Sequence, residues 1–261
     1  MVQNSPFARK LSAYLELSGP DLAALSDVYD RRRKFPAGQD LISQGQENSS
    51  AFILMKGWAC SYVLLEDGSR QIVAFHIAGD TLGLRSILFR GSDHNVEAIT
   101  NIEASEVLIS DLASAFGRST EMATAILWSA SRDVSALVAN LVGLGRRSAA
   151  ERIAHCLLEL ATRLHEVDLC DMHSFDCPLS QYQLADALGL SAVHVNRVLR
   201  ELRESGLMTF QKRRVTFDDF DGLVAFAQFD RTYLKDTLPK NRFPSPKSNH
   251  VVVRPLQYFA R

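Results

Sequence analysis

The sequence predicts an α+β fold with an N-terminal β-roll of the jelly-roll type, a long helix and a C-terminal winged helix-turn-helix. Three patterns lead to this prediction. From 35 to 100, short apolar runs alternate with glycine-containing turns, which is typical of a roll built from many short strands. From 119 to 145, apolar residues recur at heptad spacing. From 179 to 217, two short amphipathic segments meet at a glycine and lead into a basic, alternating run.

Length and composition limit what the chain can be. A chain of 261 residues can hold two domains with a core each, and we expect its parts at 1–118, 119–145, 146–230 and 231–261. No eighteen consecutive residues are apolar, and the N-terminus lacks the basic and then apolar pattern of a signal peptide. We therefore expect a cytoplasmic protein without membrane contact. The net charge of −1 still permits a basic site, because such a site is local.

The first part of the chain begins with short helices between about 5 and 34, which end in the cationic run Arg31–Lys34. Because the segment 35–38 reads Phe-Pro-Ala-Gly, we expect this run to lie at the solvated edge of a strand, with nucleic-acid binding as the alternative. Candidate strands and the hairpin turn of the roll follow at 51–55, 60–64, 66–69 (the turn) and 71–75.

The long helix carries one narrow apolar stripe. Its residues are spaced alternately by three and four positions: Leu127, Ala130, Val134, Leu137, Leu141 and Leu144. A core-facing helix of a single chain could show the same spacing. A stripe this narrow between two domains favours a parallel dimer seam instead, and Gly143 and Gly145 place a hinge near 143–148.

The segment after Leu179 has the signals of a helix-turn-helix. Ser180 is an N-cap, Gly189 ends the first helix in the left-handed conformation, and Ser191 caps the second helix, 191–205. The second helix buries the apolar positions Val195, Val198, Leu199 and Leu202. An alternating run from Met208 to Phe217, with cations at its turn, predicts a two-stranded wing.

The outward face of the second helix and the wing is basic. Between Arg197 and Arg214 there are six Lys or Arg against two Glu, a local charge of about +4. Charges on a solvated surface are the alternative explanation. We expect DNA binding, with the helix in the major groove and the wing on phosphates. The candidate DNA-binding residues are Ser180, Ser191, Ala192, Val193, His194, Asn196, Arg197, Arg200, Lys212, Arg213 and Arg214.

These residues resemble the DNA-binding end of the Crp/Fnr superfamily of bacterial transcription regulators, above all alphaproteobacterial members with Val-His-Val-Asn-Arg at 193–197. Ala-Phe-Ile-Leu-Met-Lys-Gly-Trp at 51–58 and Ala-Gly-Asp-Thr-Leu-Gly at 78–83 resemble the cyclic-nucleotide-binding-like β-roll of the same superfamily. The resemblance covers about 10–230. It implies a homodimeric regulator that binds palindromic double-stranded DNA and acts with RNA polymerase, and it matches Arg197 to a base-reading arginine.

The sequence departs from the superfamily at its ligand site. Nucleotide-binding members hold the ribose with Gly-Glu and the cyclic phosphate with Arg-Ser; the corresponding pairs here are Gly83-Leu84 and His94-Asn95. Without the arginine a phosphate lacks its bidentate partner, so we predict no cyclic AMP binding. The roll then senses another small molecule or only supports the fold. The candidate effector pocket comprises Gly79, Leu82, Gly83, Leu84, His94 and Asn95.

The sequence does not have the residue patterns of a metal, cofactor or enzyme site. Oxygen-sensing members carry an N-terminal cysteine cluster for an iron–sulfur centre, but no cysteine precedes Cys60. Cys170, His173 and Cys177 lack metal-site spacing and are expected in a loop. His76 has no paired neighbour of the kind a cupin enzyme needs. We expect no metal, no cofactor and no enzyme activity.

Further expectations concern the DNA-binding end. A ligand- or partner-binding regulatory module with a non-functional helix-turn-helix stays the alternative to a DNA-binding regulator. At position 193 the superfamily has a glutamate, so the valine there puts the usual half-site in doubt. After the wing we expect one helix over 222–234 and then a basic tail, 235–261, for which disorder and phosphate contacts are both open.

Overall fold

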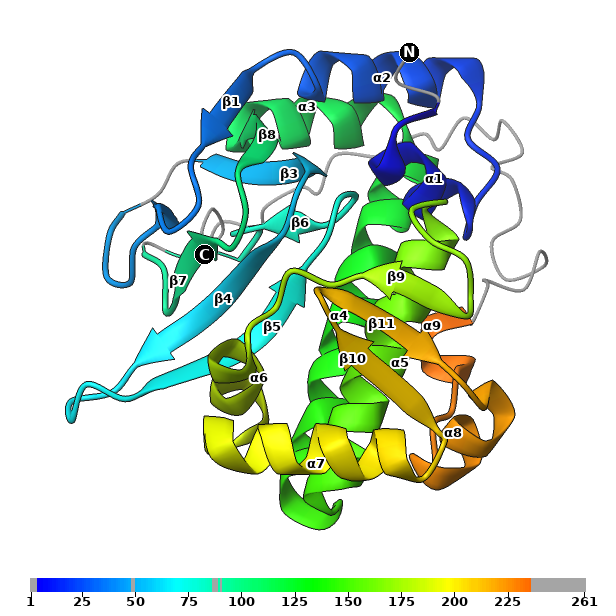
Figure 1. The fold of residues 1–261 in the computed structure, drawn as a ribbon. Coiled ribbons are helices and arrows are strands. Elements are labelled where there is room, and N and C mark those ends of the chain that lie inside the picture. The colour runs from blue at the N-terminus through cyan, green and yellow to red at the C-terminus, as the bar shows by residue number, and fades with distance from the viewer. Residues whose placement is uncertain (1–3, 48–49, 86–88, 90, 236–261) are drawn as a thin grey trace, which may run out of the picture.

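The computed structural model describes residues 4–47, 50–85, 89 and 91–235 (Figure 1). Its N-terminal part is a roll of four-stranded antiparallel sheets with the strand orders β1-β8-β3-β6 and β2-β7-β4-β5. The strands are β1 (Arg32–Phe35), β2 (Asp40–Ile42), β3 (Ser50–Lys56), β4 (Ala59–Leu64), β5 (Arg70–His76), β6 (Thr81–Leu82), β7 (Asn95–Ala98) and β8 (Ile102–Leu108). The predicted strands and the hairpin turn between β4 and β5 are confirmed.

Strand β3 is buried on both faces, which explains why its sequence is a continuous apolar run. Phe52 and Leu54 point into the core between the two sheets. Ala51 and Ile53 point the other way, into a second apolar cluster formed with the helices. These helices are α1 (Pro6–Ser12), α2 (Gly19–Val28), α3 (Ile109–Arg118) and α4 (Thr120–Arg146).

Three of the four cations in the run 31–34, most of which lies in β1, have acidic partners. Arg31 bonds to Asp111, Arg32 lies 3.5 Å from Glu103 and Arg33 lies 3.4 Å from Glu106. These contacts support a structural role at the edge of a strand, as the sequence predicts.

Helix α4 leads into the DNA-binding part. It ends at Arg146, and Ser148 starts α5 (Ala149–Glu166) with a capping box in which Ser148 and Glu151 bond to each other's backbone N–H. In Figure 1 the two helices run side by side behind the wing. Helices α6 (Gln181–Leu188) and α7 (Ala192–Glu204) then form the helix-turn-helix.

Two predictions about the C-terminal part are wrong in detail. The wing is a three-stranded sheet, because residues expected in a loop form β9 (Ser174–Asp176), which pairs with β11 (Arg214–Phe217) beside β10 (Met208–Gln211). The helix expected over 222–234 is divided into α8 (Phe220–Phe226) and α9 (Thr232–Lys235). The left-handed backbone of Gln228 (φ 47°) interrupts it, and Asp230 caps α9 by accepting from the Thr232 N–H at 2.9 Å.

The roll has a core of its own between its sheets, and a further buried cluster joins the roll to the DNA-binding part. Trp58, Phe75 and Ile77 of the roll belong to the same buried cluster as α5 and the helix-turn-helix. Polar contacts join the same surfaces: Arg70 of β5 bonds to Asp186 of α6 at 2.9 Å. No helix in the described ranges is long and apolar enough to span a membrane. Of the expected C-terminal part, 231–261, the structure describes only residues 231–235.

Candidate nucleic-acid interface

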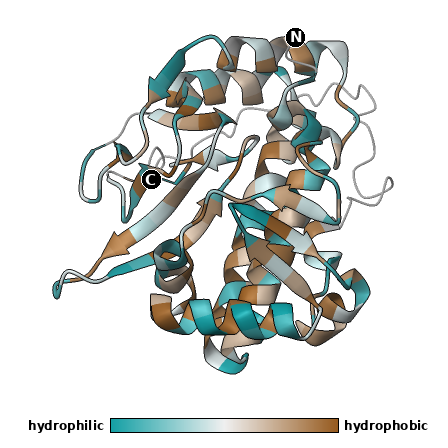
Figure 2. Cartoon of the chain, in the orientation of Figure 1, coloured by the Kyte–Doolittle hydropathy of each residue, from teal (hydrophilic) through white to brown (hydrophobic). Residues whose placement is uncertain are grey.

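Helix α7 is fixed by its caps and its apolar face. The hydroxyl of Ser191 accepts from the His194 N–H at 3.2 Å, and Gly189 (φ 62°) makes the left-handed turn that ends α6. The residues that face the core are fully or nearly fully buried: Val195, Val198, Leu199 and Leu202. Figure 2 shows the resulting mixture of hydrophobic and hydrophilic segments along α7. One face of α7 therefore packs against the core, and the opposite face is exposed to solvent.

The free face carries the predicted base-reading residues. Val193, Asn196, Arg197 and Arg200 are exposed, and Ala192 and His194 are half-buried. Arg197 and Arg200 lie 3.6 and 3.7 Å from Glu201 and Glu204, one turn further along the helix. All four side chains are more than half exposed, so these pairs are weak and leave the arginines free to turn towards a ligand.

Ser180 starts α6 in the same manner as Ser191 starts α7. Its hydroxyl accepts from the Gln183 N–H at 3.2 Å, while Gln183 Oε1 accepts from the Ser180 N–H at 2.8 Å. Tyr182, in the first turn of α6, is 74% exposed, a residue that the sequence analysis did not single out. Its phenol is of the kind that binds DNA phosphates.

The wing presents two of its three predicted cations. Lys212 and Arg213 form the turn between β10 and β11, both with positive φ (50° and 60°), and both are exposed. Arg214 was expected at the same turn, but it is the first residue of β11. Its guanidinium bonds to Asp176 at 3.0 Å and to Ser174 Oγ at 2.6 Å. Arg214 therefore ties β11 to β9 in this structure.

The apolar stripe on α4 is exposed along most of its length. Five of the six predicted seam residues are exposed, with Leu141 at 69% and Leu127 at 65%, and Ala130 is half-buried. Val138 and Val142, next to the stripe, are also about half exposed. The stripe is thus wider than the predicted seam. Met122, Ala125 and Ile126, in the first two turns of α4, are buried against α1–α3.

A cavity of about 430 Å³ lies between the roll and α4. Of the predicted effector-pocket residues, Gly83, Leu84 and His94 line it. The other three have structural places: Leu82 is buried in the core of the roll, Asn95 Oδ1 accepts from the Gln44 N–H, and Gly79 makes a positive-φ turn (φ 99°) against Pro6. The seam residues Ala130, Val134, Leu137, Leu141 and Leu144 line the same cavity from the other side.

Beside this cavity, buried charges join four segments of the chain. Asp80 accepts from Lys10 Nζ at 2.8 Å and from Arg163 Nη2 at 2.5 Å, and its Oδ2 also accepts from the Ile77 N–H at 2.8 Å. Burial would raise the pKa of Asp80, but the charges of Arg163 and Lys10 outweigh burial and keep this pKa well below its ordinary value. Lys10 also lies 3.6 Å from Asp133 of α4.

His76 also lines the cavity, with its Nε2 2.7 Å from Ser61 Oγ. Burial lowers the pKa of His76 to about 4, so the ring is neutral at pH 7. Within the described ranges, no cluster of His, Cys, Asp and Glu could hold a metal ion. Cys170 is half-buried and Cys177 is buried, and burial raises the pKa of Cys170 to about 11.

Family comparisons agree with this geometry. Residues 32–118 match the model of the cyclic nucleotide-binding domain, and residues 151–226 match that of the Crp-like helix-turn-helix domain. A probable transcriptional activator from Rhizobium leguminosarum bv. viciae is 31% identical over 193 residues, which cover 74% of this chain and 79% of the relative. The chain belongs to the Crp/Fnr superfamily. Crp/Fnr regulators bind DNA and act as dimers, so the predicted DNA-binding function is confirmed over the non-functional alternative.

Two further comparisons extend over most of this Crp/Fnr chain. The fumarate and nitrate reduction regulatory protein of Salmonella typhimurium is 25% identical over 218 residues, covering 82% of this chain and 86% of the relative. The structure of FixK2 from Bradyrhizobium japonicum superposes with a TM-score of 0.67 at 27% identity, covering 74% of this chain and 95% of that one.

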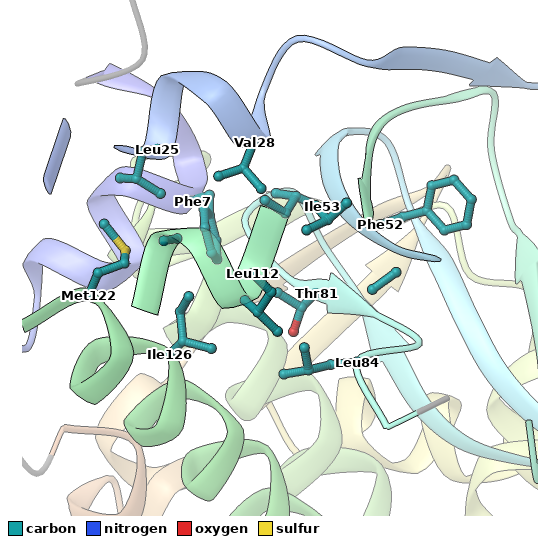
Figure 3. Close-up of a pocket in the computed structure, with 13 residues that line it drawn as sticks. Phe7, Leu25, Val28, Phe52, Ile53, Thr81, Leu84, Leu112, Met122 and Ile126 are labelled. Atoms are coloured by element: carbon teal, nitrogen blue, oxygen red, sulfur yellow. The ribbon is translucent and has the colours of Figure 1, made fainter. Parts of the chain in front are cut away.

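The Crp/Fnr roll here is apolar at one position where nucleotide-binding members use a carboxylate. Leu84 points into a second, small cavity of about 30 Å³ that is almost entirely apolar (Figure 3). Its neighbours there include Leu112 and Ile126. His94, at the position of the phosphate-binding pair, has its Nδ1 2.6 Å from Asp93, which also pairs with Arg85 at 2.6 Å. Because Arg85 offsets the charge of Asp93, what this position lacks for a cyclic phosphate is the arginine–serine pair of nucleotide-binding members.

Proposed function

We propose that this Crp/Fnr regulator acts in the cytoplasm as a homodimer whose two α7 helices read the half-sites of a palindromic operator. The observation that carries the proposal is the exposed apolar stripe on α4, because large apolar side chains at heptad spacing are stable when a second helix covers them. Two-fold symmetry places the recognition helices in successive major grooves, with half-sites roughly 34–36 Å apart.

The exposed residues of α7 divide into base-reading and phosphate-binding groups. Arg197 is the candidate for guanine, because a guanidinium pairs with both major-groove acceptors of this base. Asn196, His194 and Ala192 lie on the same part of the helix and face neighbouring bases. The phosphate-binding group comprises Ser180, Ser191, Tyr182, Arg200, Lys212 and Arg213. Arg214 is exposed as well, and its bonds to Asp176 and Ser174 use two of its five N–H donors.

Substitution of one residue from each group distinguishes base reading from phosphate binding. Arg197→Ala is expected to relax base preference at one position of each half-site and to cost about 1–3 kcal/mol for the preferred sequence. Lys212→Ala is expected to weaken binding to all sequences alike. It should also make the slope of log K against log salt concentration shallower by about one for each subunit, because each subunit loses one phosphate contact. Binding measured against a panel of single-base variants at several salt concentrations distinguishes them. Identical behaviour of the two variants would contradict the assignment.

The cavity between the roll and α4 supports an effector site that does not take cyclic AMP. At about 430 Å³ it is within the range of small-molecule sites. Leu84 replaces the glutamate that would bind the ribose, and His94-Asn95 replaces the arginine and serine that would bind the cyclic phosphate. Because seam residues line the cavity, a partner helix would cover part of it, which links any bound effector to dimer formation. Activation of transcription by such a dimer would further require contact with RNA polymerase, whereas repression would not.

Selection of duplex DNA from a random pool by the purified protein tests the proposal. We expect a palindrome with two half-sites to be recovered without any added small molecule, and we expect cyclic AMP to leave the dissociation constant of that operator unchanged. Recovery of single, unpaired sites would contradict the dimer. A requirement for cyclic AMP would contradict the interpretation of Leu84 and His94.

A further inference from the structure

The recognition helix exposes an apolar side chain at its second position. Val193 is 82% exposed, more than any other large apolar side chain in the described part of the chain. Its neighbours on the free face are polar: Asn196 and Arg197 are exposed, and both can donate hydrogen bonds to bases. An isolated apolar group of this kind gains free energy only by contact with another apolar group.

In the major groove, such a group has one specific partner. Of the four bases, only thymine presents a methyl group there, and contact between an apolar side chain and this methyl is a known form of direct readout. The N-terminal residues of a recognition helix are the ones that reach base edges. Val193 is in the first turn of α7 and lies outside the apolar cluster that holds the helix.

We infer that Val193 selects thymine in each half-site through its 5-methyl group, beside the guanine read by Arg197. This inference rests on the proposed function and specifies the DNA that the site accepts. Val193 and Arg197 are four residues apart, about 6 Å along the helix axis, and so lie on the same face. Base pairs are about 3.4 Å apart. The thymine therefore lies within about two base pairs of the guanine.

Removal of single methyl groups from the selected operator tests this inference. Each thymine of the half-sites is replaced in turn by uracil, which lacks only the 5-methyl group. One position is expected to respond, with a dissociation constant about fourfold higher for one half-site and about fifteenfold higher for both. At that position, 5-methylcytosine in place of cytosine is expected to recover part of the affinity of a C·G variant, because its methyl group occupies the same place in the groove.

Val193→Ala supplies the protein side of the test. Because the side chain packs against nothing in the protein, we expect the variant to fold and to bind about as weakly as the wild type binds the uracil operator. The variant should also lose its sensitivity to uracil at that one position. Lys212→Ala is the matched control: it should bind more weakly but keep the full response to uracil. Val193→Glu is expected to exchange the preference from T·A to C·G, since a carboxylate accepts from the cytosine amino group.

The results of these experiments distinguish failure of the thymine inference from failure of the proposed DNA-binding function. A selected operator whose affinity ignores every thymine methyl, or a Val193→Ala variant that still responds to uracil, would overturn the inference and leave the DNA-binding dimer intact. Loss of all selective binding by the folded wild type would overturn the proposed function and the inference together.

Discussion

A charge in the apolar stripe of α4 is expected to convert the protein into a monomer and to abolish selective DNA binding. In Leu137→Glu/Leu141→Glu, two carboxylates per subunit would lie in the seam, and in a two-fold dimer each would face its own copy. Burial of unpaired like charges costs far more than the stripe gains from burial. Sedimentation should show a monomer at concentrations at which the wild type is a dimer.

The effect on DNA follows from symmetry. A monomer reads one half-site, so we expect its affinity for the full operator to fall by about 10²–10⁴-fold, towards the range of non-specific binding. The fold of the subunit should survive, because the substituted leucines are 40% and 69% exposed in the single chain. Circular dichroism and thermal unfolding check this directly.

Leu169→Glu is the matched control for the seam variant. It places one carboxylate per subunit at an apolar side chain of similar exposure (50%) that is not part of α4. It should stay dimeric and bind the operator as the wild type does. A seam variant that remains a dimer with normal affinity would show that α4 does not form the subunit interface, and the exposed stripe would then need another partner.

Local signals made most of the fold predictable. The caps at Ser180 and Ser191, the left-handed glycine at 189 and the 3.6-residue period between them define α6 and α7 without reference to the rest of the chain. The turn at 66–69 works in the same way, because Gly68 (φ 83°) and the bonds from Ser69 to Asp67 are contacts between near neighbours. The alternating sequences at 60–64 and 71–75 also predicted β4 and β5, although burial does not alternate strictly along either strand.

Long-range partners were not predictable in this way. Strand β9 has three residues and exists because β11, about 40 residues further along the chain, pairs with it. Arg214 lies in β11 and bonds to β9, a partner that the sequence did not reveal. From its position next to Lys212 and Arg213 alone, the sequence placed it in the turn. The cationic run 31–34 was attributed to a strand edge, but its acidic partners more than 70 residues away could not be named.

The sequence predicted the kinds of residue that form the candidate site better than it predicted which residues belong to it. The stripe on α4 was evident from heptad spacing, whereas the contribution of Val138 and Val142 was not, because a helix of ideal period turns slowly past a strict heptad. The pocket residues Gly79, Leu82 and Asn95 were chosen because they lie in the segments that align with the ligand-binding motifs of the superfamily, and packing gives them structural roles outside the cavity.

Asp80→Ala is expected to destabilise the folded chain by about 3–5 kcal/mol, because it leaves the buried charges of Lys10 and Arg163 without their shared partner. Lys10 and Asp80 side chains are each 5% exposed, so water cannot replace the lost carboxylate. Asp80 belongs to the roll and Arg163 to α5, so the loss should also loosen the contact between the two parts. Urea unfolding followed by fluorescence measures the change.

Two comparisons show whether burial of charge is the cause. Asp176→Ala breaks the exposed ion pair with Arg214, at 3.0 Å, and is expected to cost at most about 1 kcal/mol. Glu159, which is buried and lies 3.4 Å from Arg163, must be neutralised with the other three buried charges. The quadruple variant Lys10→Met/Asp80→Leu/Glu159→Gln/Arg163→Met should therefore recover much of the stability lost by Asp80→Ala alone, because no buried ion is left unpaired. If Asp80→Ala costs no more than Asp176→Ala, the buried charges do not hold the roll against α5. The shared apolar core around Trp58 and Phe75 would then provide that contact by itself.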